Sequence, residues 1–148
     1  MNVFADFQSR IASLLEKRMA TGELPRELDL GRFVVEPPRE AAHGDLSTNA
    51  AMVYAREAKQ AGSNPRALAE GLVADLRREP DVQSAEVAGP GFINIVLKPE
   101  VYEQVLKTVL IQGQRFGAGA PSAEGRVNVE YVSANPTEIG RASCRERV

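Results

Sequence analysis

The 148-residue sequence is poor in the residues that build disulfide frameworks, zinc sites and aromatic cores. One cysteine cannot form an internal disulfide, and one histidine leaves no His/Cys cluster for zinc, so no metal site is expected. Aromatic residues make up only 5% of the chain, which predicts an aliphatic core. No apolar run approaches the length of a membrane span, and the first residues lack the basic segment of a signal peptide. We therefore expect a cytoplasmic protein with no membrane partner.

The chain also lacks an excess of positive charge. It has 18 Lys and Arg against 20 Asp and Glu, for a net charge of −2. This balance argues against bulk binding of nucleic acid through a basic face, and DNA is not an expected partner. The contents of 43% hydrophobic and 26% charged residues are typical of a soluble globular protein. The length allows one domain of ordinary size and the edge of another.

Hydrophobic periodicity predicts about four helices in residues 1–112. Their expected first residues are Phe4, Asp45, Asn64 (a cap followed by proline) and Pro99. Gly22 is expected to end the first helix. Asp45 is a natural N-cap, so the second helix is expected to include Leu46. The fourth helix is expected to turn four side chains inward: Val101, Val105, Leu106 and Val109.

Two β segments complete this domain. Phe33–Glu36 is a short β-rich run stopped by two prolines, which predicts a strand. Residues 82–97 contain two alternating runs on either side of Gly89-Pro90-Gly91, whose composition is typical of a turn. The second segment therefore predicts a hairpin. Together these features indicate an α/β (α+β) fold, with a small antiparallel sheet covered by about four helices.

The second strand of the predicted hairpin has two different faces. Ile93, Ile95 and Leu97 alternate onto one side and form a core face. The other side places the ring of Phe92 beside the amide of Asn94, just after a tight turn. Such a pair could stack on an unstacked base and hydrogen-bond to its edge. It could also be a second buried face with an edge amide, and the strand by itself favours that interpretation.

The composition changes after residue 112. Residues 113–125 are rich in glycine and alanine and read as a linker. Gly117 and Gly119 lie in this linker without the strand and helix that a phosphate loop requires. Residues 126–137 then form a new alternating strand, so a second domain begins but is not completed.

Residues 138–148 are unrelated to the strand before them. They show no apolar periodicity, and they match the translation of a common sequencing adapter. We therefore expect a non-native tail, which is excluded from reasoning about the fold. Cys144 lies in this tail and is not a candidate nucleophile.

Two segments together resemble the arginyl-tRNA synthetases. The first is that family's N-terminal domain, carried by residues 43–51, Asn64-Pro-Arg and above all Val87-Ala-Gly-Pro-Gly-Phe-Ile-Asn-Ile95. The second is residues 127–137, which are similar to the start of the Rossmann-like class I catalytic domain. The resemblance covers residues 1–137 and implies a parent enzyme that ligates L-arginine to tRNA(Arg) with ATP and magnesium. The ATP-binding His-x-Gly-His signature would follow residue 137, so the fragment itself is expected to be inactive and to hold no cofactor.

The resemblance also assigns roles to individual residues. Phe92 and Asn94 match family positions that contact a base in the D-loop of the tRNA, which reverses the preference drawn from the strand alone. Lys98 lies next to them and is interpreted either as a phosphate contact or as a solvated lysine at a strand end. The residues that match the family's arginine and adenylate pocket are Glu130, Ser133 and Asn135. Without the resemblance these three would be read as a strand carboxylate and a turn.

Two other functions remain open. One is a stand-alone RNA-binding module, which residues 127–137 disfavour. The other is a structural interaction domain that buries the Phe92 face against a partner. His43 is not a candidate catalytic residue, because Ser47 with Asp45 is a poor substitute for a triad, so capping or loop packing is expected. A monomer is expected.

Overall fold

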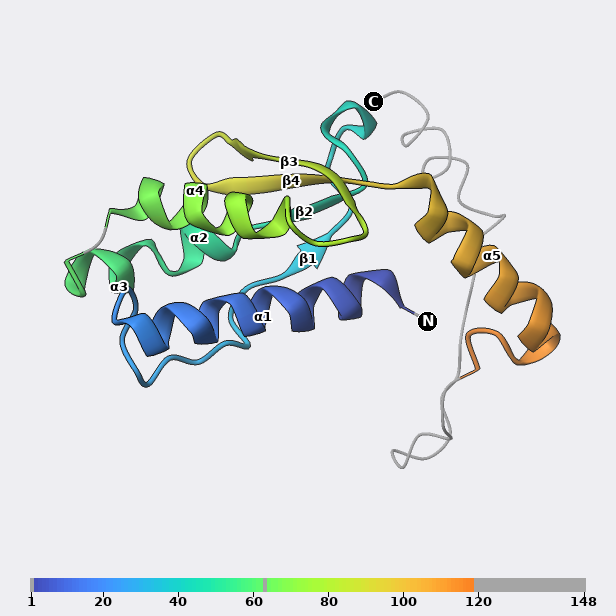
Figure 1. The fold of residues 1–148 in the computed structure, drawn as a ribbon, viewed down its shortest axis with the longest axis horizontal. Helices are drawn as coiled ribbons and strands as arrows, with labels where there is room; N and C mark the ends of the chain where they lie inside the picture. Colours follow the sequence, from blue (N-terminus) through green and yellow to red (C-terminus); the bar gives the residue numbers. More distant parts are fainter. Residues whose placement is uncertain (1, 63, 119–148) are drawn as a thin grey trace, which may run out of the picture. The chain divides into compact units, whose positions relative to one another are not determined.

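The computed structural model describes residues 2–62 and 64–118 (Figure 1). The chain divides into two compact units, Met1–Phe116 and Gly117–Val148, and the description below concerns the first. The predicted strand 126–137, the predicted tail 138–148 and most of the predicted linker lie outside the described residues. The same holds for Glu130, Ser133 and Asn135.

A four-stranded antiparallel sheet forms the centre of the first unit. Its strands are β1 (Val35–Glu36), β2 (Leu46–Thr48), β3 (Val82–Ala88) and β4 (Phe92–Leu97), in the order β1-β2-β4-β3. The predicted hairpin is confirmed as β3–β4, with Val87 opposite Ile93. Its turn depends on glycine, because Gly89 and Gly91 have φ angles of 53° and 130°.

The described residues form five α-helices and two 3-10 turns. The helices are α1 (Val3–Thr21), α2 (Ala50–Val53), α3 (Ala55–Gln60), α4 (Pro65–Leu76) and α5 (Pro99–Gln112). The 3-10 turns are η1 (Ala41–His43) and η2 (Gly113–Arg115). Two predicted helix ends are confirmed. Gly22 ends α1 with a φ of 84°, and Asn64 Oδ1 accepts a hydrogen bond from the amide of Arg66 at 3.0 Å, with Pro65 at the first position of α4.

The core lies between one face of the sheet and the helices that pack on it. Ile93 and Ile95 are completely buried and Leu97 is nearly so, which confirms the predicted core face of β4. The helices contribute Phe7, Ile11 and Leu15 from α1, and Leu68, Leu72 and Leu76 from α4. Figure 1 shows α1 running beneath β1 and α4 beside the hairpin. Because the helical core uses only one face of the sheet, the side chains of Phe92 and Asn94 lie on the other.

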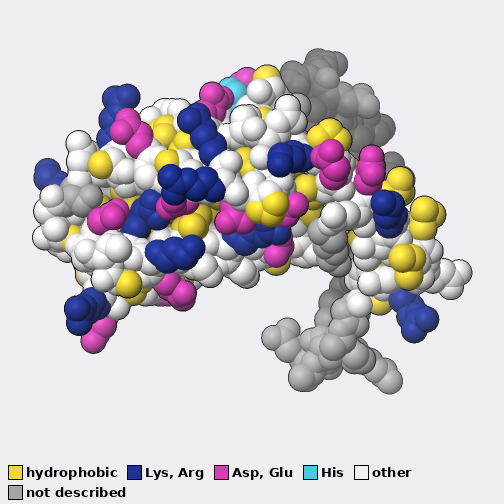
Figure 2. All heavy atoms as spheres, viewed as in Figure 1, with side chains coloured by type: hydrophobic (Ala, Val, Ile, Leu, Met, Phe, Trp, Pro, Cys, Tyr) yellow, Lys and Arg dark blue, Asp and Glu magenta, His cyan; other side chains and the backbone are white. Residues whose placement is uncertain are grey.

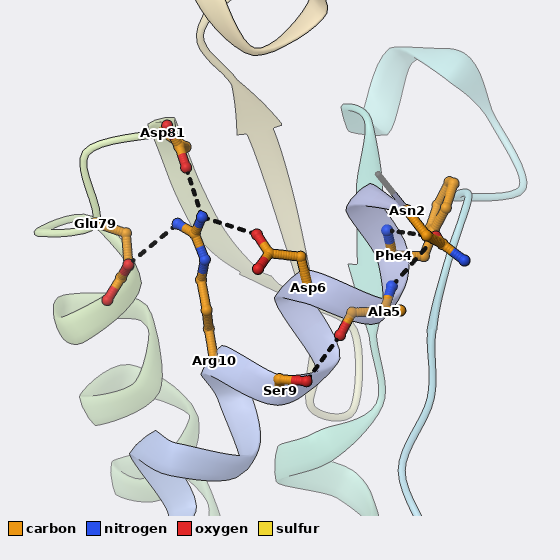
Figure 3. A network of polar contacts seen from close by, with 8 residues as sticks. All are labelled: Asn2, Phe4, Ala5, Asp6, Ser9, Arg10, Glu79 and Asp81. Atoms are coloured by element: carbon orange, nitrogen blue, oxygen red, sulfur yellow. Dashed lines mark hydrogen bonds and ion pairs between the residues drawn. The ribbon is translucent and has the colours of Figure 1, made fainter. Parts of the chain in front are cut away.

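Arg10 ties α1 to the turn between α4 and β3 (Figure 3). Its Nη2 atom lies 2.7 Å from Asp81 Oδ2 and 2.8 Å from Asp6 Oδ2, and its Nη1 atom lies 3.3 Å from Glu79 Oε2. The guanidinium carbon also lies 5.0 Å from the centre of the Phe7 ring. Because all three carboxylates are partly exposed, each pair contributes no more than about 1 kcal/mol. Their joint effect is to hold the start of β3 against α1.

The prediction that Asp45 caps a helix is wrong. Leu46–Thr48 forms strand β2, and helix α2 begins only at Ala50. Asp45 instead bonds to β4: its amide donates to the Ile95 carbonyl at 2.9 Å, and its Oδ2 accepts from the Leu97 amide at 2.8 Å. Pairing with β4 is thus favoured over helix formation at Asp45, because the backbone of β4 supplies hydrogen-bond partners for both the amide and the carboxylate of Asp45.

The inward face predicted for the fourth helix is correct for Val101 and wrong for Leu106. Val101 is buried, whereas 58% of Leu106 is exposed. Tyr102, Leu110 and Ile111 are also exposed, and Figure 2 shows hydrophobic side chains along α5. Partial desolvation of the Tyr102 hydroxyl, and then the carboxylate of Asp45, raise the pKa of Tyr102 to about 12 even though half of the side chain is exposed. Among the described residues, no helix combines the length and the apolar character needed to cross a membrane.

Candidate functional site

A hollow of about 400 Å³ opens on the face of the sheet opposite the helical core. This volume is within the range of small-ligand pockets. Three segments line it: residues 36–40 with His43, Ser47 of β2, and the end of the hairpin, which supplies Ala88, Gly89, Phe92 and Asn94. The hollow therefore forms where the loop after β1 lies beside the face of the sheet opposite the helical core.

The sheet brings Phe92, Asn94 and Ser47 together. Ser47 and Asn94 are directly opposite each other across β2 and β4, so their side chains share a face. Ser47 Oγ donates a hydrogen bond to Asn94 Oδ1 at 3.1 Å. Only 8% of Ser47 and 6% of Asn94 is exposed. Phe92 lies two residues before Asn94 on the same face and is half-buried. The hollow is thus lined by the Phe92 ring and by the Asn94 amide, which is hydrogen-bonded to Ser47.

The rim of the hollow carries charges of both signs. It includes the carboxylates of Glu36 and Glu40, the guanidinium of Arg39 and the imidazole of His43. Figure 2 likewise shows Lys and Arg side chains interspersed with Asp and Glu on the face in view, without a continuous basic patch. With two carboxylates beside one guanidinium and one imidazole, the rim has no excess of positive charge that would favour a phosphate over an uncharged planar group.

Lys98 lies apart from this hollow. It follows the last residue of β4, whereas Phe92 is the first, and it does not line the hollow. Lys98 Nζ donates to the Pro80 carbonyl at 2.6 Å. Lys98 is therefore not beside the aromatic ring of Phe92, because the two residues are at opposite ends of β4.

His43 is exposed at the end of η1 and forms part of the rim. A triad with Asp45 and Ser47 is not assembled, because the Asp45 carboxylate is bonded to the Leu97 amide and the Ser47 hydroxyl to Asn94. Within residues 2–62 and 64–118, no group of three or more His, Cys, Asp and Glu residues could hold a metal ion. Sequence reasoning considered Ser47 only as a triad member, since it placed the residue in a helix.

These features define a small α/β domain with a recess lined by an aromatic ring and a carboxamide. Comparison with known proteins identifies the family of this domain. The model of the arginyl-tRNA synthetase N-terminal domain matches residues 5–97, and the chain belongs to this family. The matched residues include the hairpin and all of the residues that line the hollow.

Similar proteins include several named arginine–tRNA ligase. The chain is 59% identical over 137 residues to the one from Beijerinckia indica, 55% identical to the one from Methylorubrum extorquens and 50% identical to the one from Rhizobium etli. Each match covers 93% of this chain and 23% of the relative. The chain thus spans less than a quarter of the length of these relatives and corresponds to their N-terminal part.

Proposed function

We propose that this chain is the N-terminal part of an arginine–tRNA ligase, and that its hollow receives a base from the D-loop of the tRNA. The intact enzyme would charge tRNA(Arg) with L-arginine in the cytoplasm, using ATP and magnesium. The observation that carries the proposal is the placement of Phe92 beside Asn94 in one recess of a family-matched domain. Family membership supports the parent activity, and the recess supports the site of contact.

The composition of the recess supports an RNA base as its occupant. Single-stranded loops of RNA are recognised by splaying a base onto an aromatic side chain and hydrogen-bonding to its edge. Phe92 supplies the ring and Asn94 the amide. Stacking contributes about 1–3 kcal/mol per base without a basic surface, so the net charge of −2 is compatible with this mode of binding.

The arginine pocket would be completed by the rest of the parent enzyme. We propose that Glu130, Ser133 and Asn135 line the arginine and adenylate site there, since a carboxylate such as that of Glu130 can form paired hydrogen bonds with a guanidinium. The 148-residue chain itself would catalyse nothing. Residues 138–148 are proposed to be adapter-derived, and the number of residues that precede them equals the 137 over which the relatives align.

The test uses a chimera in which residues 1–137 replace the matching segment of the Beijerinckia indica enzyme. Replacing Phe92 with Ala should raise the KM for tRNA on the order of tenfold, because stacking is lost. The KM values for arginine and ATP should not change. Phe4→Ala is the matched control, because Phe4 is also half-buried but packs against the helical core.

Phe4→Ala should lower the thermal midpoint and leave the KM for tRNA at the parent value. If Phe92→Ala instead lowers the midpoint and leaves the KM for tRNA unchanged, the ring is structural. The second candidate, a structural interaction domain, would then be the better account of the Phe92 face.

A further inference from the structure

We propose that Ser47 is a positioning residue that sets which way the Asn94 amide faces, so that the hollow reads a hydrogen-bond acceptor on the bound base. This inference rests on the proposed function of the hollow as a tRNA base site. It adds a residue on a different strand, with a role that is separate from stacking.

The position of Ser47 is well determined by the sheet. It lies in the middle of the β1-β2-β4 arrangement, opposite Glu36 on one side and Asn94 on the other. Its backbone is therefore held from both sides, and its hydroxyl is 3.1 Å from Asn94 Oδ1. A serine hydroxyl can donate or accept, and in this structure Ser47 donates its proton to the amide oxygen of Asn94.

This bond decides which atom of Asn94 remains for a ligand. A carboxamide has one oxygen, which accepts, and one NH₂ group, which donates. Ser47 occupies the oxygen, and the NH₂ group on Nδ2 is left. Within the described part of the chain, Asn94 Nδ2 is not among the buried side-chain atoms that lack a partner, and Asn94 lines the hollow. We therefore infer that Nδ2 faces the hollow.

An open Nδ2 donor makes the hollow selective for an acceptor atom. A ring nitrogen or a carbonyl of a base would satisfy it, whereas a base amino group placed there would leave two donors facing each other. Without the Ser47 hydroxyl, the amide could turn over and present either end, because its terminal torsion has two nearly equivalent settings. Ser47 would thus contribute both affinity and the choice of base edge.

A double-mutant cycle in the same chimera tests the coupling. Ser47→Ala should raise the KM for tRNA about threefold to tenfold, which is the effect expected from the loss of one hydrogen bond. In the Asn94→Ala background it should have no further effect, because there is no amide to position. In the Phe92→Ala background, Ser47→Ala should raise the KM for tRNA by the same factor as in the parent, because stacking and amide positioning are independent. Ser84→Ala, an exposed serine on β3, is the matched control and should leave the KM unchanged.

A second variant tests the direction of the amide without altering Ser47. Asn94→Asp keeps the shape and the oxygen that accepts from Ser47, but it replaces the NH₂ group with a second oxygen and adds a negative charge. It should raise the KM for tRNA at least as much as Asn94→Ala. If Asn94→Asp binds tRNA as well as the parent chimera does, the amide reads the base with its oxygen and the inference fails.

The outcomes separate the two proposals. If Phe92→Ala and Asn94→Ala both leave the KM for tRNA unchanged, the hollow does not bind a base and the proposed function itself is wrong. A second outcome is that both substitutions raise the KM for tRNA while Ser47→Ala has no effect, or raises it by the same factor with and without the Asn94 amide. In either case the hollow binds a base but Ser47 does not position the amide. Coupling between Ser47 and Asn94 together with the loss in Asn94→Asp would support the full assignment.

Discussion

Arg18 and Asp75 form an ion pair that joins α1 to α4, with Arg18 Nη2 2.7 Å from Asp75 Oδ2. The Arg18 side chain is 9% exposed, and its Nη1 atom also donates to the Leu14 carbonyl at 3.2 Å. Gly71 lies on α4 one turn before Asp75. A Cβ atom at that position would be 2.8 Å from Arg18 Nη2. The glycine therefore leaves the space that the guanidinium fills, which accounts for a poor helix former in mid-helix.

Gly71→Ala should consequently give no gain in stability in the parent chain. Helix propensity alone predicts a gain of about 1 kcal/mol, but the methyl group would displace the guanidinium from Asp75. In an Arg18→Met background no guanidinium fills the space beside Gly71. Gly71→Ala should then stabilise the protein by up to about 1 kcal/mol. Urea unfolding of the four proteins, followed by circular dichroism, measures both effects. An equal gain in the two backgrounds would show that Arg18 does not constrain Gly71.

Gly44 and Gly62 both have positive φ angles but differ in their surroundings. Gly44 has a φ of 106°, and a Cβ atom there would lie 2.7 Å from the Ile95 carbonyl oxygen. Gly62 has a φ of 81°, and among the described residues other than its chain neighbours no atom lies within 4 Å of such a Cβ. Gly62→Ala should therefore cost only the backbone strain, about 1–2 kcal/mol.

Gly44→Ala should cost more than Gly62→Ala by roughly 1–3 kcal/mol, because β4 is paired on both sides and cannot move away from the methyl group. Thermal unfolding of the two variants compares these costs. Equal midpoints would indicate that the loop before β2 can lift from β4 without loss.

Acid should weaken the fold through Glu57. Its Oε1 atom lies 2.6 Å from Arg32 Nη1, and this hydrogen bond holds the pKa of Glu57 below its usual value of 4.5. Because the pKa is lower in the folded state, the pairing contributes its full stability above the unfolded pKa and loses it as the pH falls through the folded pKa. The stability difference between the parent and Glu57→Gln should therefore shrink as the pH falls below about 4.5.

Urea midpoints between pH 7 and pH 3 would measure this difference. Glu70→Gln is the control, since the Glu70 carboxylate is paired with Arg66 on the exposed side of one helix. Its substitution should change the pH profile less. A parent and a Glu57→Gln protein with parallel profiles would show that the Arg32 pair does not contribute to acid sensitivity.

The elements that could be predicted from the sequence are those whose determinants are local. Asn64 and Pro65 start α4, and Gly22 ends α1, because capping depends on backbone groups within a few residues. The alternation of Ile93 and Ile95 with Phe92 and Asn94 followed from strand geometry, and the turn glycines placed the hairpin. The grouping of Phe92 with Asn94 was thus predictable, while their role in binding RNA stays a prediction.

Tertiary structure alone decided the remainder of the site. Leu46–Thr48 reads as the first turn of a helix, yet it became a strand because β4, 47 residues away at Asn94, offered its backbone as a partner. That pairing placed Ser47 beside Asn94 and Asp45 against Leu97. Helical periodicity likewise could not show that α5 buries Val101 but leaves Leu106 exposed, because a periodic pattern identifies an apolar side without revealing what lies against it.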